Sequence, residues 1–292
     1  MVVKHKKLAF TLVELLTVLV IITMLVALLI PALVVVRNMA KETQQKAQLT
    51  TIEMGLTAFK NDYGDYPPSD WQGNPLRTDY SGPQMLAEAL VGWDLLGFHP
   101  KSAWRADGKD KDGGNDAYLG ATTGTPTERE ENLRQRVGPY LELATTNAFR
   151  LEQLFNDTKG LAGDTFVLCD VFAVRRITLP AGNIVKAGTP ILYYKANPAW
   201  KNIEDGEYNK RIYNVYDNSE LINLKSVTVD GKPGKEHPLG EVIENLYDFD
   251  DKGGIRDRKV EAMPWPHRPD SYILISAGVD GLYGTSDDIC NF

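Results

Sequence analysis

The chain has 292 residues, room for one large domain or two small ones, and 43% of them are hydrophobic. Its 39 acidic and 32 basic residues give a net charge of -7, which provides no general attraction for phosphate backbones and disfavours nucleic-acid binding. The hydrophobic content excludes a disordered chain, and 25 Gly and 16 Pro without a period exclude a collagen-like one.

The N-terminal segment has the composition of a membrane-spanning helix. From Leu15 to Val36 the chain is apolar except for Thr17 and Thr23, and a helix of this length crosses about 30 Å of hydrocarbon. Basic residues within the first seven positions place the N-terminus in the cytoplasm by the charge bias, with the bulk of the chain outside. A cleaved secretory signal fits less well, because its apolar run has only about 7 to 15 residues.

One carboxylate interrupts this apolar N-terminal segment. Glu14 is the single charged residue between Leu8 and Val36. A carboxylate in a lipid-facing helix costs about 2.5 to 3.5 kcal/mol near the centre and less toward the end. Glu14 therefore needs a partner.

Residues 8–16, with the sequence LAFTLVELL, resemble the processing site of type IV pilins and of the pseudopilins of type II secretion. In that family a short basic leader precedes a cut before Phe, and Glu is the fifth mature residue. The resemblance implies that a prepilin peptidase removes the leader, 1–9, by cutting between Ala9 and Phe10, and methylates the new amino terminus. The family usually has Gly before the cut, so Ala9 is a departure that could slow or block cleavage.

The resemblance also assigns assembly roles within the segment 10–36. It implies that Glu14 neutralises the α-ammonium of Phe10 on a neighbouring subunit, so that two costly charges cancel only in the filament. The family tends to have a Pro twenty-one residues after the first mature residue, and Pro31 stands there. A proline in a helix removes a backbone donor and is expected to bend it.

The helix is expected to continue over 37–62 as an amphipathic half. Leu49, Ile52, Leu56 and Phe59 recur at helical spacing and predict one apolar stripe. Gly64 and two prolines then end the helix, in a passage similar to the Gly-x-Tyr-Pro of the family. The stripe should lie against a globular head, residues 63–292, with an enlarged insertion at about 98–165.

The remaining elements predict an α+β, pilin-like fold, with the long helix packed on a small antiparallel sheet. Helices are expected at Gln84–Val91, from a capping box of Thr127 and Glu130 to Val137, and near Ala148–Phe155. Runs of β-branched and aromatic residues predict strands at Phe166–Ile177, Ile191–Tyr194 and Tyr272–Ser276. The Asp-rich segment 107–116 is interpreted as a solvated surface loop, with a second ion site as the alternative.

The chain end resembles that of the major pseudopilin of type II secretion, where a Ser-x-Gly-x-Asp-Gly turn and an Asp-Ile-x-Asn-aromatic ending enclose a structural calcium ion. The corresponding letters here are SAGVDG from Ser276 and DICNF from Asp288. The resemblance implies Asp280 and Asp288 as side-chain ligands, backbone oxygen near Ser276, and a contribution from Asp287. Calcium takes about six to eight hard oxygen ligands. The alternative is a loop held only by hydrogen bonds from backbone to Asp.

Residues typical of catalysis are not found in a usable pattern. Zinc-ligand spacing, a nucleophile elbow, a phosphate-binding loop and a dinucleotide turn are all missing from the sequence, so no enzyme activity is predicted. Cys169 and Cys290 are either free thiols or, in an exported domain, one disulfide.

The resemblance implies a structural subunit of a type II secretion pseudopilus, in which identical subunits stack head to tail through contacts that do not close. It implies a single-pass protein of the bacterial inner membrane, with its head in the periplasm. The implied partners are prepilin peptidase, an assembly platform with its ATPase, and minor pseudopilins. A surface type IV pilin and an uncleaved, membrane-anchored calcium-binding protein are the alternatives, and a soluble exported hydrolase is a more distant one.

Overall fold

The computed structural model describes residues 11–69, 79–120, 123–143, 146–179, 182–200, 211–229, 231–239, 254–262 and 265–292. The chain divides into two compact units, Met1–Thr43 and Gln44–Phe292, which are described separately. Its elements in chain order are α1 (Leu12–Tyr63), α2 (Gly82–Val91), α3 (Pro126–Gln135), β1 (Ala148–Arg150), α4 (Leu151–Leu154), β2 (Phe166–Leu168), β3 (Arg175–Thr178), β4 (Ile184–Ala187), β5 (Leu192–Lys195), the 3-10 helix η2 (Val215–Asp217), α5 (Ser219–Ile222), β6 (Tyr272–Ser276) and β7 (Ile289–Cys290).

The described part of the first unit is the N-terminal part of α1. Its side chains are exposed without interruption from residue 12 to residue 37, and almost all of them are apolar. By length and composition, α1 can cross a membrane. Pro31 lies inside the helix, and the bend expected there stays a prediction.

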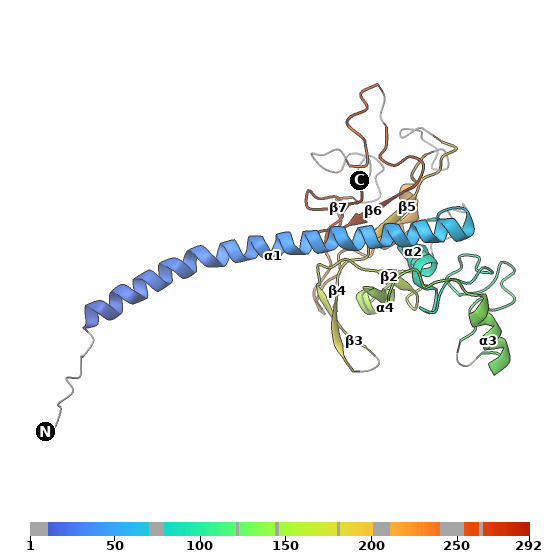
Figure 1. Cartoon of the computed structure of the whole chain (residues 1–292), viewed down its shortest axis with the longest axis horizontal. Coiled ribbons are helices and arrows are strands. Elements are labelled where there is room, and N and C mark those ends of the chain that lie inside the picture. The colour runs from blue at the N-terminus through green and yellow to red at the C-terminus, as the bar shows by residue number, and fades with distance from the viewer. Residues whose placement is uncertain are drawn as a thin grey trace. The chain divides into compact units, whose positions relative to one another are not determined.

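The second unit is built on the predicted apolar stripe of α1, which is confirmed. Leu49, Ile52, Leu56 and Phe59 are each at most 2% exposed. The first three belong to one core cluster with side chains of α2, β2, β5, β6 and β7. Figure 1 shows α2 and the sheet of β5, β6 and β7 beside the C-terminal part of α1.

The strands form three small antiparallel sheets, β1–β2, β3–β4 and β5–β6–β7. Strand β6 lies at the centre of the third sheet and is buried along its whole length. Its alternating side chains divide between two cores: Tyr272 and Leu274 face the cluster that includes the stripe, and Ile273 and Ile275 face the other. The predicted fold class, α+β with a long N-terminal helix on small antiparallel sheets, is confirmed.

Two predicted elements are wrong in part. The strand predicted at Phe166–Ile177 is interrupted, because the Asp170 carboxylate accepts hydrogen bonds from the backbone N–H of Phe172 and of Thr189 and closes a turn after β2. The helix predicted near Ala148–Phe155 begins as strand β1, which pairs with β2, and only α4 is helical.

The N-cap of α3 also lies two residues before the predicted one. Thr125, not Thr127, is the N-cap: its backbone N–H donates to the Glu128 carboxylate at 2.7 Å, and its hydroxyl accepts from the Glu128 N–H. Pro126 occupies the first helical position, where a missing N–H costs nothing. The helix ends at Gln135, before the predicted Val137, which forms an isolated bridge with Phe98.

The stripe should set the stability of the second unit. Leu56→Ala removes a side chain with no exposed surface and should lower the free energy of unfolding by about 2 to 5 kcal/mol. Met54→Ala is the matched control on the same helix, because Met54 is 60% exposed, and it should change stability by less than about 0.5 kcal/mol. Denaturant unfolding of the full chain in detergent measures both, and equal losses would contradict the packing.

Candidate functional site

The N-terminal candidate site begins with a helix cap. Ala9 and Phe10, the predicted processing residues, lie outside the described residues. The Thr11 backbone N–H donates to Glu14 Oε2 at 2.9 Å and the Thr11 hydroxyl donates to the same oxygen at 2.8 Å. The Glu14 N–H donates back to the Thr11 hydroxyl at 3.2 Å, so the two residues form a capping box.

The cap provides part of the stabilisation that the Glu14 carboxylate needs in an apolar segment. Its carboxylate lies at the helix N-terminus, where orphan N–H groups and the helix dipole favour negative charge. The cap was not predicted from the sequence, although the Thr-x-x-Glu spacing of Thr11 and Glu14 is its signature. The partner that the family implies, Phe10 of a neighbouring subunit, is untested.

The C-terminal candidate site is the loop between β6 and β7, and Asp287 organises it. Asp287 Oδ2 accepts from the backbone N–H of Val279 at 2.7 Å and of Asp280 at 3.0 Å, and its Oδ1 accepts from the Thr285 hydroxyl at 2.6 Å. Gly278 has a φ of +63°, and a Cβ there would collide with the backbone of Asp287. The loop is thus closed by one carboxylate whose oxygens are both occupied.

Asp288 is the unusual carboxyl of this loop. Its Oδ2 accepts from the Gly284 N–H at 2.8 Å, but its buried Oδ1 has no donor among the residues that the structure describes. Burial raises the pKa of Asp288 to about 8, and the negative charges of Asp287 and Asp280 add to the effect. Burial also raises the pKa of Asp280, whose Oδ1 accepts from the Leu282 N–H at 2.8 Å.

Ser276, the fourth predicted ligand, forms a side-chain hydrogen bond to a residue outside this loop. It is the last residue of β6, and its hydroxyl donates to Asp170 Oδ2 at 3.2 Å. Within the described residues, no three His, Cys, Asp or Glu side chains converge as a metal centre. The structure therefore brings Asp280, Asp287 and Asp288 into one loop without assembling a side-chain cage.

The other sequence candidates have ordinary structural surroundings. Cys169 and Cys290 are not joined in a disulfide, and burial raises the pKa of the Cys169 thiol. In the Asp-rich segment, Asp107 pairs with Arg105 at 2.7 Å and Asp110 accepts from the Asn115 amide at 2.9 Å. Hydrogen bonds from Arg105 lower the pKa of Asp107. These are the contacts of a surface loop.

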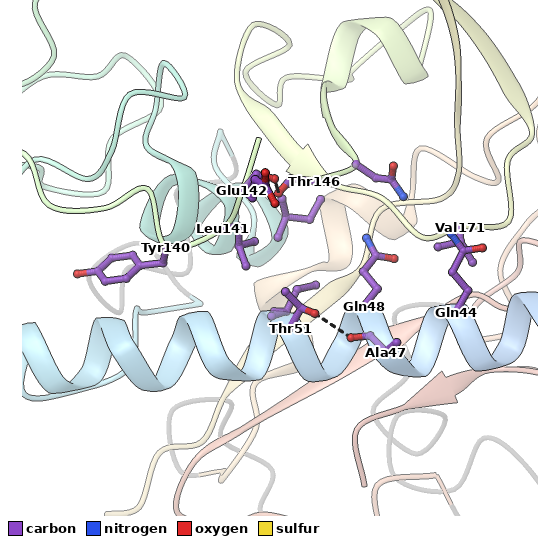
Figure 2. A pocket seen from close by; sticks show the side chains of 12 residues that line it. Gln44, Ala47, Gln48, Thr51, Tyr140, Leu141, Glu142, Thr146 and Val171 are labelled. Atoms are coloured by element: carbon purple, nitrogen blue, oxygen red, sulfur yellow. Dashed lines mark hydrogen bonds between the residues drawn. The ribbon is translucent and has the colours of Figure 1, made fainter. Parts of the chain in front are cut away.

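A groove of about 360 Å³ lies beside α1, opposite residues 140–142 and Val171. Figure 2 shows Gln44 and Gln48 projecting from the helix toward the opposite wall, where the Gln48 amide donates to the Cys169 carbonyl at 2.9 Å. The described lining of the groove has one carboxylate, Glu142, and contains no His, Cys, Ser or Lys.

The N-terminal site matches a known sequence motif. Residues 4–30 match the family model described as the prokaryotic N-terminal methylation motif. Comparison of the chain with curated proteins and with solved structures gave no match. The resemblance inferred from residues 8–16 is confirmed: this segment is of prepilin type, consistent with a pilin-like protein.

The pKa of Asp288 predicts how stability changes with pH in the absence of divalent cations. Between the ordinary value, 3.8, and about 8 the folded loop holds a proton that the unfolded chain has released, so the contribution of Asp288 to stability falls as pH rises through this window. Thermal unfolding of the full chain in detergent with a chelator, from about pH 5 to about pH 8.5, measures the slope.

The neutral variant Asp288→Asn should flatten this pH dependence. Asp112→Asn is the control, because Asp112 is an exposed carboxylate of the Asp-rich segment. If Asp288→Asn keeps the slope of the unsubstituted chain, the proton is not held at Asp288.

Proposed function

We propose that the chain is a structural subunit of a type II secretion pseudopilus, which assembles through its N-terminal helix. The prepilin-type motif at residues 4–30, joined to an exposed apolar helix whose first turn is capped by Thr11 and Glu14, is the observation that carries the proposal. The motif by itself supports a pilin-like role generally. The secretion type is favoured by the aspartate loop at the chain end, since its sequence resembles that of the major pseudopilin.

The N-terminal part of α1 would supply the assembly force. Its exposed apolar side chains need lipid around a single chain, or neighbouring helices in a filament. In the single chain, Glu14 accepts from its own Thr11. In the filament, its carboxylate would bind the α-ammonium of Phe10 on the next subunit, and two charges that are costly in an apolar interior would neutralise each other.

A calcium ion would fit the chemistry of the C-terminal loop. Asp288 has a buried oxygen without a donor among the described residues, and the carboxylates of Asp280, Asp287 and Asp288 repel one another. Asp280 and Asp288 would hold the ion, with Asp287 and backbone oxygen near Ser276 as further donors. Bound calcium would supply positive charge in place of the proton on Asp288 and stabilise the loop.

The proposal includes a location and a set of partners. The basic N-terminus would remain in the cytoplasm, α1 would anchor the chain in the bacterial inner membrane, and the second unit would lie in the periplasm. Prepilin peptidase would process the chain, a platform with its ATPase would extract it, and minor pseudopilins would join the filament.

Two alternatives make different predictions. A surface type IV pilin would form filaments that extend beyond the cell without affecting protein export. An uncleaved calcium-binding protein would remain a membrane-anchored monomer, which the departure at Ala9 would explain.

Processing tests the proposal first. We expect intact-mass and N-terminal peptide mass spectrometry of the protein from its native membrane to find a chain that begins at N-methyl-Phe10. A chain that still begins at Met1 would overturn the filament model and favour the anchored monomer, and Ala9→Gly would then be expected to restore cleavage.

The role of Glu14 is tested in the same preparation. Glu14→Gln should leave cleavage after Ala9 intact but abolish filaments seen by electron microscopy, because an amide cannot neutralise an ammonium. Glu42→Gln is the control, as Glu42 is an exposed residue of α1. Normal filaments of Glu14→Gln would remove Glu14 from the mechanism.

Calcium should stabilise the full chain measurably. At about pH 7.5, about 10 mM calcium should raise the unfolding temperature by about 3 to 5 °C if the site has a dissociation constant of about 0.1 to 1 mM. Asp280→Asn and Asp288→Asn should abolish the rise and Asp112→Asn should retain it. A rise of the same size in all three variants, or with magnesium, would exclude this loop as the site.

A further inference from the structure

The hairpin of β3 and β4 has an outward face with an unusual composition. Side chains alternate along both strands, so that Ile177 and Ala187 are buried while Arg176, Ile184 and Lys186 are exposed. Ile184 is 68% exposed, among the highest values for a large apolar side chain of the second unit. The hairpin thus presents an apolar side chain next to two cations.

The two cations are direct cross-strand partners. Arg176 pairs with Lys186 in the antiparallel register, and like charges in opposite positions destabilise a hairpin. Neither side chain has a carboxylate partner among the described residues. The neighbouring Arg175, in contrast, donates to the Leu154 carbonyl and to Asn156 Oδ1, each at 2.7 Å. In a chain of net charge -7, this unpaired cationic face calls for an acidic partner.

An acidic cavity lies elsewhere on the same unit, beside α3. Its volume is about 550 Å³, and its charged and titratable lining residues are Asp110, Asp116, Glu128, Glu131, Lys101 and His99. Asp110 and Glu128 are engaged by Asn115 and by the cap of α3. Asp116 and Glu131 are exposed, and neither has a hydrogen-bond donor or cation within the described part of the chain.

A buried histidine in the lining of this cavity indicates which kind of ligand the cavity suits. His99 is 1% exposed, and its Nδ1 accepts from the Lys101 N–H at 3.1 Å. The neutral ring therefore carries its proton on Nε2, which is buried and finds no acceptor among the described residues. An N–H group cannot coordinate a metal ion, but it can donate to a carbonyl. The cavity thus suits a peptide segment with cationic side chains better than a bare cation.

The two surfaces lie far apart on one copy. Figure 1 shows the β3–β4 hairpin and α3 at opposite ends of the second unit along the direction of α1. The hairpin therefore cannot enter the cavity of its own chain, but it can reach that of another. Contacts between two different surfaces repeat in one direction and build an open filament.

We propose that the β3–β4 hairpin of one copy docks in the α3 cavity of the next copy, with Arg176 and Lys186 paired to Asp116 and Glu131. Ile184 is covered in this contact, and a hairpin carbonyl accepts from His99 Nε2. The proposal rests on the proposed filament and specifies which faces of successive heads meet. A second copy is the occupant because the same chain carries both charge patterns at opposite ends.

Cysteine cross-linking in the assembled protein tests this contact. Lys186→Cys and Asp116→Cys are introduced into the full chain, which keeps its buried Cys169 and partly buried Cys290, and membranes are treated with a short bifunctional maleimide. Separately tagged chains that each carry one variant should give only mixed dimers. The chain that carries both should give a ladder beyond the dimer, which a two-fold symmetric contact cannot produce.

The controls separate this contact from general proximity. Lys232→Cys, an exposed lysine of the same unit, combined with Asp116→Cys should give no more product than the unsubstituted chain. Filaments without the ladder would overturn the proposed contact and leave the filament intact. Absence of filaments from the unsubstituted, processed chain would overturn the proposed function, and this contact with it. Cross-linking of Lys186→Cys to a different protein would also overturn it.

Charge reversal gives an independent readout. Arg176→Glu with Lys186→Glu should lower the yield of ladder and filament by about tenfold, the loss expected from about two exposed ion pairs. Adding Asp116→Lys and Glu131→Lys to the same chain should restore the yield. Lys232→Glu with Lys235→Glu makes the same change in net charge and should leave it unchanged. Loss without rescue would assign the effect to folding and contradict the pairing.

Discussion

Burial of one face of α1 is the interaction on which the rest of the second unit depends. Leu49, Ile52 and Leu56 lie in a single core cluster with side chains from one helix and four strands that are distant in sequence. Gly55 lies within this buried part of the helix, where a Cβ would come within 3.2 Å of Leu90 and Leu141. The missing side chain lets α2, a helix buried on every side, approach α1 closely. Helix α1 is therefore the framework onto which the head folds.

The parts of the fold that depend on local pattern could be predicted from the sequence, and the parts that depend on pairing could not. The stripe and β6 follow from periods of 3.6 and 2 within one segment. Residues 148–150 have no comparable signal, because they are a strand only through pairing with β2. The aspartate loop shows the same division. Its carboxylates are visible in the sequence, but the burial of Asp288 depends on distant residues, since Gly284 approaches Leu239 closely and the Tyr283 N–H donates to His237 Nδ1.

The carboxyl groups of Glu88 and Asp288 both have buried oxygens but differ in their hydrogen-bond donors. Glu88 on α2 is buried, and its oxygens accept from the hydroxyls of Tyr80 at 2.7 Å, of Tyr118 at 2.8 Å and of Ser102. Burial raises its pKa, while these three donors oppose the shift. Glu88 thus accepts hydrogen bonds from neutral hydroxyl groups at both oxygens and has a structural role. Asp288 has one buried oxygen with no donor in the described chain, and for this reason the proposed calcium site includes it.

The hydroxyl network around Glu88 also connects the lining of the acidic cavity to the core of the second unit. Tyr118 accepts from the His99 N–H at 3.3 Å while it donates to Glu88, and this connects the wall of the acidic cavity to the buried helix α2. The hairpin is fixed in a comparable way, because Ile177 and Ala187 are part of a core cluster. Both faces of the proposed stacking contact are therefore held by the interior of the same unit. A contact that must repeat along a filament gains from such fixed faces, since little conformational entropy is lost when they meet. In the proposed filament the head would then be a rigid receiving surface, and α1 would supply the direction in which the heads are repeated.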